Sequence, residues 1–130
     1  MVGESEELRL MDPETAVEVA TANRDLIVGI KVRLGRWASG IHGMVPFEYA
    51  LQVAEEAGMP MMVHIDDPPP SYQQVVERLR KGDVLTHCFR PFPNTPSTSD
   101  RRVRPEVLAA RQRGVFFDVE NSSRPEHVAY

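Results

Sequence analysis

Short, nearly continuous apolar runs alternate along the chain with longer segments whose apolar residues recur at helical spacing. The helical spacing predicts helices at about residues 13–23, 46–57, 71–82 and 105–113. The apolar runs predict strands at about residues 26–33, 60–65, 83–88 and 115–119. This strict helix–strand alternation, with strands that are apolar on both sides, favours an α/β fold built on a parallel sheet buried on both faces.

Capping residues support two of these helices. Asp12 followed by Pro13 is typical of a helix start, with an N-cap side chain and a proline in the first turn. Ser71 with Gln74 has the spacing of a capping box. We expect the helix that begins there to run until Gly82 ends it.

The composition limits the class of protein. At 130 residues the chain is expected to form a single domain over residues 1–130, with irregular ends at 1–10 and 120–130. A formal net charge of −4 without a basic run argues against a nucleic-acid partner. No apolar run could span a bilayer and the first residues do not form a signal peptide, so no membrane association is expected. The single cysteine, Cys88, suits a reducing compartment and favours a cytoplasmic protein.

Three predicted strands carry a nitrogen-bearing side chain at or near their ends, namely Lys31, His64 and His87. Functional groups of parallel α/β folds gather at the carboxyl ends of the strands. A lysine inside an apolar strand is costly unless its charge is paired or removed. We interpret the three residues as an incomplete metal site, with two imidazole ligands and a lysine that carbon dioxide converts to a carbamate. The alternatives are a hydrogen-bonded structural role for each histidine and a Lys31 ammonium that extends to solvent.

Other polar residues are weaker candidates. His42, in the loop after the first strand, could contact substrate, although a solvated loop histidine is the simpler explanation. Arg90 could hold a substrate carboxylate, or it could be exposed or ion-paired. Cys88 has no identifiable catalytic partner and is not interpreted as a nucleophile.

The motifs around the candidate ligands resemble those of the amidohydrolase superfamily, and more narrowly its dihydroorotase-like amidohydrolase/deacetylase branch. They are GIKVR at residues 29–33, PMMVHI at 60–65 followed by DPPP at 67–70, and GDVLTHCF at 82–89. The resemblance covers about residues 8–119. It implies a partial TIM-type (β/α) barrel of about four parallel strands, equivalent to strands four to seven of eight.

The resemblance also implies roles for the candidate ligands. Lys31 would be carbamylated and bridge two divalent metals, with zinc the expected metal, and His64 and His87 would bind the second metal. The family's substrates imply a small-molecule amide as the binding partner. The implied function is hydrolysis of amide or ester bonds in N-acyl or cyclic amide compounds.

The chain also departs from the family pattern. A His-x-His pair on strand one and an aspartate on strand eight, the usual general base, are both missing, and no histidine precedes Lys31. Asp66 stands where the family typically has glycine. We therefore expect an amidohydrolase fragment that is inactive by itself, with metal binding weak or absent. The alternative is a non-enzymatic half-barrel that serves as an interaction or metal-binding module.

An open half-barrel also predicts association. Two unpaired strand edges and an uncovered inner face favour pairing with a second copy. We therefore expect a homodimer or a higher homo-oligomer with a largely apolar interface.

Overall fold

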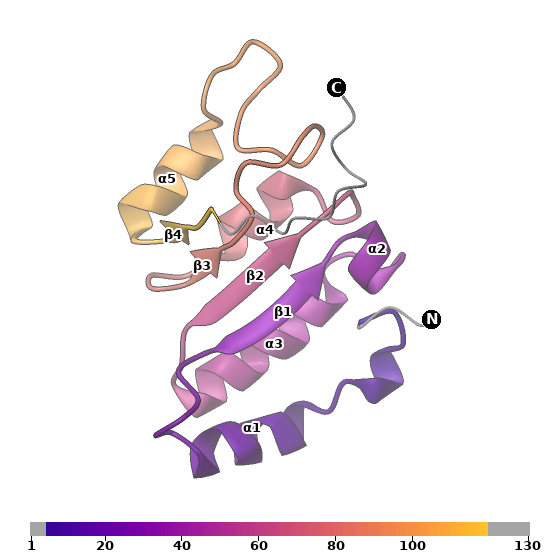
Figure 1. The fold of residues 1–130 in the computed structure, drawn as a ribbon, viewed down its shortest axis with the longest axis vertical. Helices are drawn as coiled ribbons and strands as arrows, with labels where there is room; N and C mark the ends of the chain where they lie inside the picture. Colours follow the sequence, from indigo (N-terminus) through magenta and orange to yellow (C-terminus); the bar gives the residue numbers. More distant parts are fainter. Residues whose placement is uncertain (1–4, 120–130) are drawn as a thin grey trace.

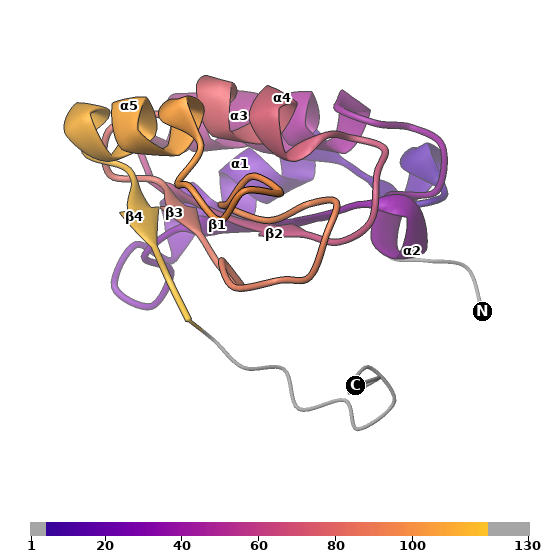
Figure 2. The same ribbon diagram turned by 90° about the horizontal axis from the view of Figure 1, so that it is seen from above.

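The computed structural model describes residues 5–119, which form a four-stranded parallel sheet with α3, α4 and α5 on one side of it (Figures 1 and 2). The strands, in spatial order, are β1 (Ile30–Leu34), β2 (Met61–Ile65), β3 (Val84–Leu85) and β4 (Phe116–Phe117). The helices are η1 (Leu8–Leu10, a 3-10 turn), α1 (Pro13–Ala22), α2 (Arg36–Ser39), α3 (Val45–Ala57), α4 (Tyr72–Arg78) and α5 (Pro105–Arg113). The predicted alternation of four parallel strands with helices is confirmed.

The helix starts follow the predicted caps. The Asp12 side chain accepts a hydrogen bond from the Thr15 N–H at 3.0 Å and begins α1. Ser71 and Gln74 form the reciprocal capping box that begins α4. The first turn of a helix leaves backbone N–H groups unpaired, and these side-chain acceptors satisfy them. Helix starts can therefore be recognised in the sequence from the residue types at these positions.

The end of α4 was predicted wrongly. The helix stops at Arg78 and Leu79 is extended, so Gly82 lies beyond it rather than at its end. The buried Asp83 carboxylate explains the early stop, because it accepts hydrogen bonds from both the backbone N–H and the guanidinium of Arg80. These bonds fix Arg80 outside the helix.

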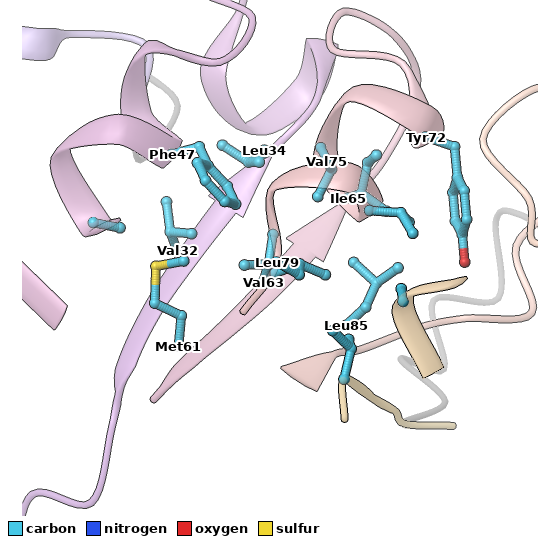
Figure 3. Close-up of a cluster of buried hydrophobic side chains, with 14 of the residues drawn as sticks. Val32, Leu34, Phe47, Met61, Val63, Ile65, Tyr72, Val75, Leu79 and Leu85 are labelled. Atoms are coloured by element: carbon cyan, nitrogen blue, oxygen red, sulfur yellow. The ribbon is translucent and has the colours of Figure 1, made fainter. Parts of the chain in front are cut away.

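A continuous apolar core lies between the sheet and the helices on its covered face (Figure 3). Its fully buried members include Leu34, Phe47, Val63, Ile65, Val75 and Leu85. Each such side chain contributes about 1.5–3 kcal/mol relative to exposure. The core therefore fixes the strands that hold the candidate ligands: His64 is near the carboxyl end of β2 and His87 follows β3, whereas Lys31 is the second residue of β1 and so lies near its amino end, not its carboxyl end as expected.

Within residues 5–119, α3, α4 and α5 do not cover the opposite face of the sheet (Figure 2), which agrees with the uncovered inner face expected of a half-barrel and corrects the expectation of burial on both faces. Lys31 and Phe116 are exposed there. The predicted first strand also begins too early, because Leu26 and Val28 are exposed and pairing starts only at Ile30, whose N–H bonds to the Pro60 carbonyl. None of the helices in this part of the chain has the length and apolar character that crossing a bilayer requires.

Candidate metal centre

The pairing of β1 with β2 places Lys31 and His64 on the same face of the sheet, opposite the face that packs against α3, α4 and α5. Lys31 is in register with Met62, and Arg33 is in register with His64. Side chains alternate along a strand, so residues 31, 33, 62 and 64 share one face. Lys31 lies two residues before the level of His64, roughly 6.5 Å along the strand. That is about the length of an extended lysine side chain, so the two groups can meet.

The exposure of Lys31 corrects one step of the sequence argument. The lysine was expected to be buried in an apolar strand, where its charge would be costly. It is exposed because no helix covers its face of the sheet within residues 5–119. Burial therefore gives no reason to expect a carbamate at Lys31, and only its position and the family resemblance support that role.

His87 reaches the same site through an unusual backbone conformation. Strand alternation from the buried Leu85 would direct residue 87 toward the helices. His87 instead has a φ of +58°, in the left-handed region that non-glycine residues rarely adopt. The ring of His87 lies edge-on to the ring of His64, with centroids 4.7 Å apart and planes at 80°. Strained backbone of this kind clusters at functional sites.

The ring of His64 is buried and one of its nitrogens has no hydrogen-bond partner among the described residues. The residue is only 5% exposed, and its Nε2 is buried without a hydrogen bond in the described part of the chain. The Asp66 carboxylate is close, at 3.7 Å from Nε2, but beyond hydrogen-bond distance. Burial lowers the pKa of His64, and the smaller opposing effect of Asp66 does not reverse this. The neutral ring is the form that binds metal, so the site fits a metal ligand at Nε2.

Asp66, which directly follows β2, is hydrogen-bonded to the turn after β1. Its Oδ1 accepts the Trp37 N–H at 3.2 Å, and its own N–H donates to the Leu34 carbonyl at 3.0 Å. Residue 35 has a φ of +117°, and a Cβ there would lie 2.0 Å from Asp66 Oδ1. Gly35 is therefore required by the position of this carboxylate. Sequence reasoning noted Asp66 only as a departure from the family pattern and missed the contact.

The described residues alone do not complete a metal site from histidine, cysteine and acidic side chains. Within residues 5–119 no group of three or more such side chains is arranged to hold an ion. The imidazole pair therefore needs a further ligand, for which Lys31 is the candidate on the same face. A second carboxylate, Asp118, follows β4 and accepts a hydrogen bond from Thr86 Oγ1 at 2.8 Å.

The weaker candidates lie in the loops. The His42 ring bonds through Nε2 to the Glu6 carbonyl oxygen at 2.8 Å, which ties the N-terminal segment to the loop. Arg90 is half-buried in the loop after β3. Substrate contacts by either residue stay a prediction. Burial raises the pKa of the Cys88 thiol, which disfavours the thiolate that a nucleophile requires.

Comparison with known proteins gives related curated sequences, among them two bacterial deacetylases. The chain is 37% identical over 97 residues to a deacetylase of Enterococcus faecalis, a match that covers 73% of this chain and 26% of the relative. It is 40% identical over 88 residues to a deacetylase of Brucella anthropi, with 68% and 22% covered. The chain thus spans about a quarter of the length of these relatives. No protein-family model matches the sequence.

Solved structures give the same picture. A crystal structure of an adenine deaminase superimposes with a TM-score of 0.84 and 32% identity, covering 89% of this chain and 32% of that one. A dihydroorotase superimposes with a TM-score of 0.77 and 30% identity, covering 91% and 32%. The likeness in fold therefore extends over nearly the whole chain and about a third of each solved structure.

Proposed function

Because this chain corresponds in sequence and fold to a segment of the amidohydrolase-superfamily barrel, we propose that it forms part of a metal-dependent amidohydrolase, with Lys31, His64 and His87 as metal ligands. The observation that carries the proposal is the buried, unpaired Nε2 of His64 beside the ring of His87. A buried polar atom without a partner is rare, and a metal ion would satisfy it. The names of the relatives support amide bonds of N-acyl or cyclic compounds as the substrate class.

Each residue would have a distinct part in such a site. His64 and His87 would contribute neutral ring nitrogens, and Lys31 would contribute a carbamate oxygen after reaction with carbon dioxide. A divalent ion such as zinc, when bound, lowers the pKa of water and polarises a carbonyl. Arg33, in register with His64, adds positive charge beside the site that favours an anionic lysine carbamate.

We further propose that the 130 residues hydrolyse amides very poorly on their own. The sequence contains no His-x-His pair. Asp118, which follows β4 and accepts a hydrogen bond from Thr86, is a carboxylate that would have to substitute for the family's general base. Turnover of N-acetyl amino acids that His64→Ala abolishes would contradict this part of the proposal.

The open sheet face favours the related idea of self-association. In the described residues β1 and β4 are the edges of the sheet, and Phe116 on β4 is 63% exposed. Association of two copies along these edges would bury apolar surface. Sedimentation at micromolar concentration should give a dimer or larger species, and a stable monomer would exclude this arrangement.

Cobalt(II) tests the metal assignment directly, since its visible absorption reports the ligand set. We expect one weakly bound ion per chain, with clear loss of binding in His64→Ala and in His87→Ala. His42→Ala is the matched control, because His42 bonds to a backbone carbonyl outside the site. Tight binding of two ions per chain, or equal loss in all three variants, would overturn the assignment.

A further inference from the structure

Trp37, the chain's single tryptophan, lies at the carboxyl end of the sheet and is 72% exposed. It belongs to α2, which follows β1 directly. Figure 1 shows α2 at the arrowhead of β1, next to the arrowhead of β2, the strand that carries His64. The Trp37 N–H donates to one oxygen of the Asp66 carboxylate, whose other oxygen lies 3.7 Å from His64 Nε2, so this exposed aromatic residue is next to the candidate metal centre.

The turn that follows His64 holds Trp37 in a fixed orientation. The Trp37 backbone N–H donates to Asp66 Oδ1 at 3.2 Å, and the indole Nε1–H donates to Asp67 Oδ2 at 3.1 Å. Gly35 admits the Asp66 carboxylate into the same turn, so the backbone on both sides of the ring is restrained. The polar edge of the indole is satisfied while the rest of the ring is left bare. A ring that is already ordered loses little entropy when a ligand stacks on it.

A second exposed aromatic residue follows the candidate ligand His87, which lies just after β3. Phe89 comes two residues after His87 and is 77% exposed. Exposed apolar side chains at the amino end of β1, Leu26 and Val28, are aliphatic and make no comparable pair with a candidate ligand. Exposed aromatic residues thus follow both β1, which carries Lys31, and His87.

We propose that Trp37 is a substrate-binding residue of this site, which stacks against an aromatic ring carried by an N-acyl amide, with Phe89 contributing to the same apolar rim. This inference rests on the proposed function and adds the substrate class. Aromatic rings stack favourably in offset or edge-on arrangements, by about 0.5–1.5 kcal/mol beyond their buried area. Asp67 acts as a positioning residue, since its carboxylate accepts the indole N–H at the edge of the ring and leaves the faces of the ring free for a ligand.

The single tryptophan makes the test direct, because its fluorescence reports from the proposed site alone. The full chain in chelator is titrated with N-acetyl-L-phenylalanine and with N-acetyl-L-alanine. We expect a fluorescence change with the phenylalanine compound at concentrations about fivefold lower than with the alanine compound. Ligand-observed NMR extends the comparison to variants. Trp37→Ala should lose the preference, Asp67→Ala should weaken it, and Leu26→Ala, the exposed control, should keep it.

Each other outcome overturns the inference. Equal responses to the two compounds, or a preference that survives Trp37→Ala, would exclude stacking on this ring. Fluorescence that changes with protein concentration alone would show that a second copy covers Trp37 instead. Cobalt binding without aromatic preference would refute this inference and leave the proposed function intact. Aromatic preference without cobalt binding would refute the proposed function and, with it, the role of Trp37 in a hydrolytic site.

Discussion

Each end of the sheet buries an ionisable side chain, but among the described residues only the one at the amino end has its hydrogen bonds satisfied. At the amino end Asp83 is fully buried, and its carboxylate accepts hydrogen bonds from the Met61 N–H at 2.8 Å and the Arg80 N–H at 2.7 Å, together with two from the Arg80 guanidinium at 3.1 Å. At the carboxyl end His64 is only 5% exposed, yet its Nε2 has no hydrogen-bond partner in the described residues.

We interpret this difference as that between a structural end of the sheet and a functional one. A buried group with all its bonds made stabilises the fold, whereas a buried group left unpaired destabilises it by about 1–3 kcal/mol unless a ligand completes it. In parallel α/β folds the carboxyl end carries chemistry and the amino end carries stability. The bonding of Asp83 and His64 follows that division.

The largest expected effect is at the amino end. Asp83→Ala removes the acceptor for the Met61 N–H and leaves the Arg80 guanidinium without its buried partner. We expect the free energy of unfolding to fall by about 3–5 kcal/mol, measured by urea denaturation. Asp100→Ala, which breaks an exposed ion pair with Arg102, should change it by no more than about 0.5 kcal/mol. Equal effects of the two substitutions would refute the structural role of Asp83.

A smaller loss of stability is expected at the carboxyl end of the sheet, where Gly35 is packed against the Asp66 carboxylate. Gly35→Ala forces a side chain into a φ of +117° and against the Asp66 carboxylate, so it should lower the free energy of unfolding by about 2–3 kcal/mol. Gly43→Ala is the matched control, because Gly43 also has a positive φ of +56° but nothing within 4 Å of the added Cβ. It should cost about 1 kcal/mol.

A double-mutant cycle sharpens this test. Asp66→Gly removes the carboxylate that fills the space over residue 35, so Gly35→Ala should cost less in that background. The same cycle run with Gly43→Ala should show no coupling. An additive result for the Gly35 pair would mean that Asp66 does not set the requirement for glycine.

Much of the fold could be predicted from the sequence because the residues that determine each helix and strand lie within or next to it. The caps at Asp12 and Ser71 act within one helical turn, and the apolar runs mark strands by their own composition. The end of α4 was missed because Asp83, which comes after the helix, captures Arg80. The exposure of Lys31 could be given only as an alternative, because it depends on what lies across the sheet, which no local pattern records.

The candidate site, likewise, could be predicted only in part from the sequence. The placement of His64 near the carboxyl end of its strand could be predicted because strand ends in an alternating α/β chain are predictable positions, whereas its role and that of Lys31 stay predictions. The contacts that shape the site were not found, because Asp66 meets Gly35 and Trp37 across about thirty residues of sequence. The left-handed backbone of His87 was equally invisible, since a non-glycine residue gives no sign of a positive φ.

The stability of His64→Leu, measured with and without zinc, tests the central claim most directly. Leucine has a similar volume and no polar atom to leave unpaired. In chelator the variant should therefore be more stable than the native chain by about 1 kcal/mol. Zinc at a hundredfold excess over its dissociation constant should stabilise the native chain by about 2.7 kcal/mol and leave the variant unchanged, which reverses the order. A variant that is less stable in chelator, with equal zinc effects on both proteins, would contradict the account.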